Sequence, residues 1–553
     1  MVRGREREEG GPSIGASPAM AGNLPLKICV CVVDFDLVSG QVCRLVEPSD
    51  ALGEAERKAI AYHAFPDSKS IELTLSPGKN SINDTLFHFR IRSRQEETVS
   101  SQGWHYAYAF CRQRHDPSLP RGGDQISVVV VANIPVATTL LQVTKFAGEV
   151  YFNKGEEALS QVVDSVRSWG NLGSRDKPTE ALGEGRGEGE GDKAAKAPSD
   201  RSDDEGESSG DSFDVFRQIS PRGGKQLTVR ADEFIVPVVM PEKRTSILDL
   251  KLPERNPEYL GDAHTRMAFS KVCLYSCLSG VAKHLWRIWE AVLVGEPCMI
   301  FGSNPEMVSS SVAACMDLIF PLPYSADYRP YFTIHDKEFA QVQNSENCGK
   351  DGNPSLIGVT NTYFLKAYAT WPTILTVGGG DASGGLSYNS PMSSPRSPHR
   401  GGGWGKSWFS FKSEDRSNLI NTVDSFTQDL FTTDAGLVKE NYRILGSLDL
   451  VSDDASEMQW ATSASLNTKI LRRHFQEVTE AFLGQLDPYA KGFYDAKGQE
   501  EVLASLATQQ DFPTILKETV SSDRTKLLKL YQKFCSGPNF KPWFEGRGRS
   551  DKR

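Results

Sequence analysis

The sequence predicts a mixed α/β protein of two lobes, the second of which ends in a layer of helices. Three observations lead to this prediction. Short apolar runs typical of strands alternate with helical patterns in two regions, before residue 170 and after residue 224. A polar, acidic tract separates the two regions. From Leu466 onward the apolar residues recur only at helical spacing, so we expect the chain to end in helices.

The second region is organised around the stretch 293–336. Cys298–Phe301 is a short and wholly apolar run, which suits a strand buried on both faces. Asn304 and Pro305 are residue types favoured at the N-cap and in the first turn of a helix. The helix that follows has one apolar face, formed by Val308, Val312, Cys315 and Ile319.

The rest of the second region predicts further strands and helices. The aromatic stretch 324–336 has no period, so we expect an ordered loop there, and Ser355–Val359 is a second buried strand. Phe234–Met240 is an apolar strand that opens the lobe. A helix over 281–292 carries Trp289 on its apolar face, where core packing is the ordinary role of a tryptophan. Further helices are predicted over 466–486, 500–509 and 527–534, with the aromatic residues after 540 folding back onto them.

The first region predicts two strands, a helix, three strands and two helices. Lys27–Phe35 is a nearly continuous apolar strand. In the third strand, Phe87, Phe89 and Ile91 alternate with polar residues, which indicates one buried and one solvent-exposed face. The other expected elements are strands at 42–46, 104–110 and 126–131 and helices at 54–62, 136–151 and 156–169. This order is that of a longin-type α/β sandwich.

Composition sets the expected boundaries. Residues 170–224 and 379–410 are rich in Gly, Ser, Pro and charge and hold too few apolar residues to offset the entropy of ordering, so we expect disordered linkers. The predicted organisation is a disordered leader at 1–22, a longin-like lobe at 23–169, the acidic linker at 170–224, a central α/β module at 225–378, the second linker at 379–410 and a helical part at 411–553.

Charge and cysteine content exclude several classes of protein. Residues 171–214 hold 13 acidic against 6 basic residues, so they carry seven of the nine net negative charges and leave the rest nearly neutral. A basic stripe for nucleic acid is absent from the sequence. The ten cysteines form no CxxC pair, which favours reduced structural thiols in the cytoplasm over a metal or redox centre. No apolar run approaches the roughly 20 residues that span a bilayer.

The order of strand, helix, aromatic proline-rich loop and Ile-Gly-Val strand resembles the central module of DENN-domain proteins, and most closely the DENN-domain-containing protein 6 subfamily. Further stretches that match the subfamily appear in its order along the chain. They are Val33–Asp36, Ala64–Ser68, Asp327–Asp336, Leu471–Phe475 and Pro538–Phe544.

The resemblance implies a guanine-nucleotide exchange factor that promotes GDP release from a Rab-type small GTPase in membrane traffic. It implies a cytoplasmic protein that binds the GDP-bound or nucleotide-free GTPase and reaches endosomal membranes peripherally through it. Tyr328, Arg329 and Tyr331 are the candidate interface residues, because Tyr and Arg are enriched at binding hot spots. The alternative is that the loop 324–336 only packs against the rest of the fold.

Two further functions remain open at the level of sequence. Longin/DENN relatives of the folliculin type are GTPase-activating proteins that use an arginine from the loop before the last longin strand, and Arg121 occupies the matching place. Here Gly122, Gly123 and the nearby Asp116 and Asp124 favour an ordinary turn residue over an arginine finger. A non-catalytic Rab effector or scaffold is the third possibility.

No catalytic constellation emerges from the residues. His335 and Asp336 are adjacent in sequence, which points their side chains in different directions, and no activated Ser or Cys can be placed beside them. We therefore expect no covalent catalysis, no cofactor and no metal. An exchange factor needs none of these, because it lowers nucleotide affinity by binding the nucleotide-poor GTPase more tightly.

Overall fold

The computed structural model describes residues 27–67, 82–93, 103–168, 225–240, 274–378, 429–449, 457–489 and 496–550, apart from single residues and short loops within them such as 119–122. All the described helices and strands belong to one compact unit, formed by 27–168 and 223–553. The expected leader and both expected linkers lie almost wholly outside the described residues, so the predicted domain boundaries stay predictions.

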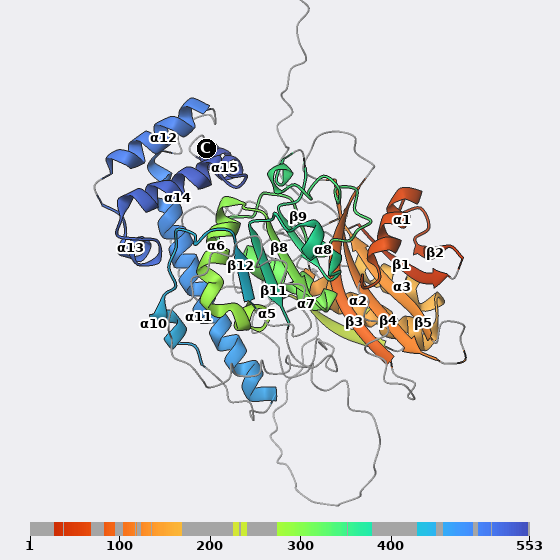
Figure 1. Ribbon diagram of the computed structural model, residues 1–553. Helices are drawn as coiled ribbons and strands as arrows, with labels where there is room; N and C mark the ends of the chain where they lie inside the picture. The colour runs from red at the N-terminus through yellow and green to blue at the C-terminus, as the bar shows by residue number, and fades with distance from the viewer. Residues whose placement is uncertain are drawn as a thin grey trace, which may run out of the picture. The chain divides into compact units, whose positions relative to one another are not determined.

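The N-terminal sheet has five antiparallel strands in the order β2-β1-β5-β4-β3 (Figure 1, red to orange). Its strands are β1 (Ile28–Asp36), β2 (Gly40–Glu47), β3 (Ile82–Arg92), β4 (Trp104–His115) and β5 (Gly123–Ala132). Its helices are α1 (Glu54–His63), α2 (Ala137–Lys154) and α3 (Glu157–Arg167). The eight expected elements are all present and in the expected order.

The continuous apolar run in β1 follows from helices on both faces of this sheet. Cys29, Cys31 and Val33 belong to a core that includes Ile60 of α1. Val30 and Val32 are also fully buried, and successive strand residues point to opposite faces. α2 and α3 cover that second face, where they pack against β4, β5 and β1. A strand buried on both faces needs no polar alternation.

The expectation of a solvent-exposed face on β3 was wrong. His88 and Arg90, two of the three polar residues of the alternating pattern, are buried, and the third, Arg92, is exposed. The reason is that β3, at the edge of its sheet, packs against helix α7 (Pro305–Asp317) of the central region. The backbone N–H of His88 donates a hydrogen bond to Ser309 Oγ of α7 (3.5 Å). His88 and Arg90 on β3 therefore mark a contact of the N-terminal sheet with the central region.

The central sheet has the order β12-β11-β8-β10-β9 (Figure 1, green to cyan), parallel except for the antiparallel β12. Its strands are β8 (Cys298–Gly302), β9 (Tyr328–Arg329), β10 (Leu356–Val359), β11 (Thr373–Val377) and β12 (Asp429–Thr432). The helices around it are α5 (Leu274–Leu278), η4 (Ser279–His284), α6 (Leu285–Val294), α7 (Pro305–Asp317), η5 (Ser345–Asn347) and α8 (Tyr363–Ala367). A separate antiparallel pair is formed by β6 (Lys225–Ala231) and β7 (Phe234–Met240).

Two local predictions in the central region are confirmed. Asn304 caps α7, because its side-chain oxygen accepts a hydrogen bond from the N–H of Glu306 (2.8 Å), and Pro305 occupies the first turn. The tryptophans of α6 are core residues: Trp286 donates to Nε2 of His474 (3.0 Å) and Trp289 donates to the hydroxyl of Thr479 (2.9 Å). Both partners lie on α11 (Glu457–Gly484), so these tryptophans join α6 to the C-terminal helices.

The C-terminal helices (Figure 1, blue) are α10 (Tyr442–Gly446), α11 (Glu457–Gly484), η7 (Asp487–Tyr489), α12 (Ala496–Thr508), α13 (Thr514–Thr519), α14 (Arg524–Ser536) and α15 (Phe540–Ser550). The aromatic residues after 540 pack onto the layer as expected, but from a regular helix. Phe540, Trp543 and Phe544 recur at helical spacing and are all buried. Within the described residues, no helix combines the length and the apolar character needed to cross a bilayer.

Candidate functional site at the junction of the two sheets

The loop 323–338 connects α7 to the edge of the central sheet. Tyr328 and Arg329 form β9, which pairs with β10, and the N–H of Phe332 donates to the carbonyl oxygen of Gly358 (2.7 Å). The approach is so close that a Cβ atom on Gly358 would lie 2.3 Å from the carbonyl oxygen of Pro330. This contact fixes the loop on one side, and its other side contacts the N-terminal sheet.

Arg90 of β3 makes the first group of contacts with the loop. Its Nε donates to the carbonyl oxygen of Tyr328 (2.5 Å), and its Nη2 forms an ion pair with Asp327. The guanidinium group lies between two rings, 3.6 Å from the centroid of Tyr328 and 4.0 Å from that of Trp104 on β4. Cation–π contacts of this kind gain strength when they are desolvated. The buried charge of Arg90 is therefore satisfied from both sheets.

Arg329 makes the second group of contacts, with three carboxylates of its own loop. Two of its nitrogens bond Asp327 in a fork at 3.1 and 3.2 Å, Nη2 also reaches Glu338 (3.2 Å), and Nη1 reaches Asp336 (3.5 Å). Its guanidinium lies 4.5 Å from the ring centroid of Trp104. Burial alone would lower the pKa of Arg329, but the three carboxylates raise it, so the residue stays charged.

His63, in the last turn of α1, makes a third connection. Its Nε2 lies 2.8 Å from Asp336 Oδ2, and its Nδ1 lies 2.8 Å from the carbonyl oxygen of Ala59. Burial opposes charge on both partners, but each charge stabilises the other: the pKa of His63 is raised and that of Asp336 is lowered. Because both ring nitrogens face acceptors, the imidazolium form satisfies the geometry best. His335 instead stacks on Tyr62, at 4.4 Å between centroids.

Tyr331 contacts both the N-terminal sheet and the chain segment that follows α1. Its hydroxyl accepts a hydrogen bond from the N–H of Asp67 and lies 3.1 Å from the hydroxyl of Thr360. The Thr360 hydroxyl in turn donates to the carbonyl oxygen of Asp67 (3.0 Å). The ring packs edge-on against Phe87 of β3, with 5.2 Å between centroids. Tyr331 thus binds both sheets through its ring and its hydroxyl.

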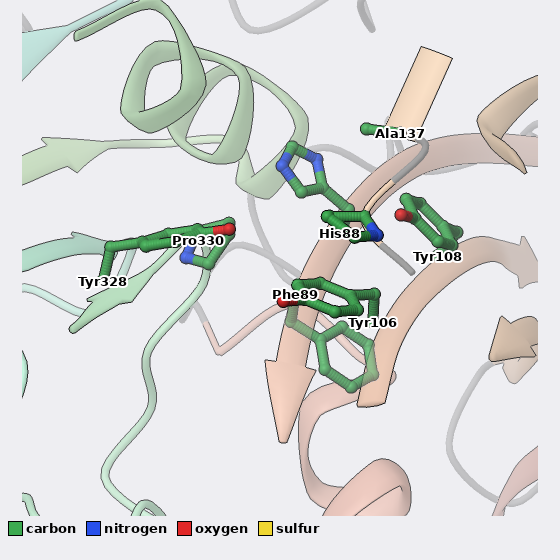
Figure 2. Close-up of a pocket in the computed structure, with 8 residues that line it drawn as sticks. His88, Phe89, Tyr106, Tyr108, Ala137, Tyr328 and Pro330 are labelled. Atoms are coloured by element: carbon green, nitrogen blue, oxygen red, sulfur yellow. The ribbon is translucent and has the colours of Figure 1, made fainter. Parts of the chain in front are cut away.

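Two buried ionisable groups lie at the contact between α7 and β3. Burial raises the pKa of Glu306 well above its usual range, although the backbone of Leu86 and the charge of Lys145 act in the opposite direction. Burial lowers the pKa of His88 to about 4, and within the described residues neither of its ring nitrogens has a hydrogen-bond partner. Figure 2 shows His88 beside Tyr108 at a cavity of about 10 Å³. That volume admits nothing larger than a water molecule, so it is a packing gap.

The junction brings together the three residues that the sequence singled out. Tyr328, Arg329 and Tyr331 lie within one loop, and their exposed fractions are only 7%, 3% and 1%. Their side chains are buried at the contact between the two sheets. Direct contact of these residues with a GTPase stays a prediction. Sequence reasoning missed the partners of this loop on the N-terminal side, which are His63, Asp67, Arg90, Arg92 and Trp104. The alternation of Arg90 and Arg92 with apolar residues on β3 gave no signal for them, because an exposed strand face has the same pattern.

Arg121 lies outside the described residues, so its role as an arginine finger stays untested. The strands that flank its loop are described. Asp124, expected to pair with Arg121, forms a fork with Arg114 (2.9 and 3.2 Å), and Asp116 accepts hydrogen bonds from Ser118. These strand ends border a cleft of about 790 Å³ that α2 and the start of α3 also line.

The described residues hold no group of three His, Cys, Asp or Glu side chains placed to bind a metal ion. The carboxylates of the junction, Asp327, Asp336 and Glu338, each face an arginine, which makes them ion-pair partners instead of general bases. These contacts hold the loop 323–338 against the N-terminal sheet.

The chain is similar to several known proteins along most of its length. No protein-family model matches the chain. Human protein DENND6B is 26% identical over 557 residues, which cover 94% of this chain and 78% of the relative. Mouse protein DENND6A is 26% identical over 94% of this chain and 76% of its own length, and the DENND6 homologue of Dictyostelium discoideum is 25% identical over 94% and 70%. The similarity to proteins named DENND6 over 94% of the chain supports a DENN-domain protein of the DENND6 subfamily.

The length of the stretch that matches DENND6 proteins carries more information than the 26% identity. Coverage of 94% leaves no room for a similarity confined to one sheet. The similarity therefore extends over the N-terminal sheet, the central sheet and the C-terminal helices. The resemblance recognised from the sequence motifs is confirmed at the level of the subfamily.

Proposed function

We propose that this chain is a guanine-nucleotide exchange factor that promotes GDP release from a Rab-type small GTPase in membrane traffic. The observation that carries the proposal is the similarity to DENND6 proteins over 94% of the chain. An exchange factor acts by binding its GTPase and needs no covalent chemistry of its own. The preferred partner is the GDP-bound or nucleotide-free GTPase, and the chain reaches endosomal membranes peripherally through it.

The N-terminal sheet is, in this proposal, a longin-like lobe. Two features support the assignment: the element order from β1 to α3 and the strand order β2-β1-β5-β4-β3, with helices over both faces. A GTPase-binding surface composed of two sheets works only if their relative position is fixed. The contacts of Arg90, His63 and Tyr331 provide such fixation within the described residues.

Tyr328, Arg329 and Tyr331 have an indirect part in the proposal. Because all three are buried between the sheets, we propose that they set the position of the GTPase-binding surface. A substitution at any of them would then reduce exchange together with stability. A contact residue at the surface would reduce exchange alone, so the two roles can be separated by measuring both quantities on one variant.

The test is a panel of purified Rab proteins loaded with a fluorescent GDP analogue. We expect the full chain to accelerate GDP release from at least one Rab and to leave GTP hydrolysis by the loaded Rab unchanged. Arg121→Ala is expected to keep the exchange rate within about threefold, which is less than about 1 kcal/mol of transition-state stabilisation. An arginine finger would instead contribute roughly 10³–10⁵ in hydrolysis rate.

Each of the other outcomes identifies a different function. Faster GTP hydrolysis with the wild-type chain, lost in Arg121→Ala, would mean a GTPase-activating protein. Binding of a GTP-loaded Rab without a change in either rate would mean an effector or scaffold. Circular dichroism of every sample shows that a negative result comes from a folded chain.

A further inference from the structure

Two of the cysteine thiols in the described part of the chain are accessible in part, those of Cys43 and Cys348. The other seven described cysteines are buried. Neither accessible thiol takes part in the exchange function proposed above. Their surroundings differ sharply, and this difference makes them a natural pair for comparison.

Cys43 belongs to a cluster of three thiols on one face of the N-terminal sheet. It lies on β2 opposite Val33 of β1, and Cys31 lies two residues before Val33, so that the two thiols are diagonal neighbours on the face that α1 covers. The pKa of the buried Cys31 thiol is raised well above its usual range, first by the neighbouring thiols of Cys29 and Cys43 and then by burial. Cys43 Sγ also lies 3.6 Å from the carbonyl oxygen of Leu45.

Charge near Cys43 favours its thiolate. The neighbouring Cys31 thiol lowers the pKa of Cys43 most, and the positive charge of Arg57 on α1 acts in the same direction, whereas burial and the negative charge of Asp34 oppose this shift. Arg57 is held in place by the carbonyl oxygens of Leu52 (3.1 Å) and Ser49. Burial raises the pKa of Cys348 to about 12, and its sulfur lies 3.9 Å from the carbonyl oxygen of Val342.

We propose that Cys43 is an oxidation site for peroxide and that Cys31 is its resolving thiol. The Cys43 thiolate attacks one peroxide oxygen: an S–O bond forms, the O–O bond breaks, and the departing hydroxide takes a proton to become water. The Cys31 sulfur then attacks the sulfenic sulfur, an S–S bond forms, the S–O bond breaks, and a second water leaves. Two thiols are oxidised to one disulfide while one peroxide is reduced to two waters.

The strand register gives this disulfide a structural consequence. Diagonal cross-strand neighbours have Cα atoms about 7–8 Å apart, whereas a disulfide spans about 4.4–6.8 Å. β2 must therefore shift toward Cys31 when the bond forms. The register irregularity next to Val33 supplies the extra residue that can absorb such a shift. The outer strand of the N-terminal sheet thus changes position with the redox state.

The decisive experiment treats the folded full chain with hydrogen peroxide and maps its peptides by mass spectrometry without reduction. We expect a disulfide between Cys31 and Cys43 while Cys348 remains a free thiol. The pKa of Cys43 is lowered and that of Cys348 is raised, so Cys43 holds the larger thiolate fraction and should react at least about tenfold faster than Cys348. Equal rates at the two positions would overturn the proposal.

Cys31→Ala separates the resolving role from simple reactivity. In this variant Cys43 is expected to be oxidised beyond sulfenic acid to sulfinic acid, because no thiol remains to trap the intermediate. Formation of the sulfinic acid in the wild-type chain, without the disulfide, would exclude Cys31 as the resolving thiol. That second result needs no variant, so the proposal stays testable if Cys31→Ala does not fold.

Discussion

Replacing Arg329 with Ala is expected to lower the free energy of unfolding by about 3–5 kcal/mol, the usual cost of removing one partner from a buried ion pair. The substitution leaves Asp327, Asp336 and Glu338 with less positive charge around them. Asp327 and Asp336 are themselves buried or nearly so, and solvent cannot replace the lost guanidinium without opening the junction. Exchange activity is expected to fall along with stability.

The measurement is urea denaturation followed by tryptophan fluorescence. Arg473→Ala is the matched control, because Arg473 also pairs with a carboxylate, that of Glu477 at 2.9 Å, but is 61% exposed. An exposed pair of this kind contributes about 0.3–0.5 kcal/mol. Unchanged stability of Arg329→Ala with exchange lost would contradict our view and make Arg329 a contact residue for the GTPase.

Gly358→Ala is the second substitution for which we expect a large effect. The new Cβ would meet the carbonyl oxygen of Pro330 at 2.3 Å and a methyl group of Val308 at 2.5 Å. One neighbour is backbone and the other belongs to the core face of α7, so neither can move cheaply. Overpacking costs about 1–3 kcal/mol and more where backbone must shift. The loop would be pushed off β10, and with it the contacts to the N-terminal sheet.

Gly446→Ala controls for the loss of glycine itself, since a Cβ at Gly446 on α10 would have no heavy atom within 4 Å. That control is expected to keep or slightly raise stability, because alanine restricts the unfolded chain. Thermal unfolding of both variants provides the comparison. If Gly358→Ala were as stable as Gly446→Ala, the close approach of the loop to β10 would not be needed for the fold.

The parts of the fold that depend on local pattern could be predicted from the sequence. The apolar run Cys298–Phe301 is β8, the Asn304–Pro305 signal begins α7, and the tryptophan stripe of α6 is core. In each case the information lies within a few residues of the element itself. The regular spacing of Phe540, Trp543 and Phe544 contained the same kind of signal, and it corresponds to the helix α15.

The junction could not be predicted, because it depends on contacts between distant parts of the chain. His63 and Asp336 are 273 residues apart, and Arg90 and Asp327 are 237 apart. Nothing near Arg90 in the sequence shows that α7 and the loop will cover the polar side of β3. A buried arginine with an acid partner on another element has the same local pattern as an exposed one. The polar face of β3 therefore looked like a solvent face until its partners were known.

The central claim is that this chain changes nucleotide affinity through differential binding, and its most direct test is an equilibrium measurement. The affinity of the full chain is compared for one responsive Rab in its nucleotide-free, GDP-loaded and GTP-loaded forms. We predict binding to the nucleotide-free form that is tighter by about 5–150-fold, the usual range of coupling between two sites. Equal affinity for all three forms, or a preference for the GTP-loaded form, would contradict the account.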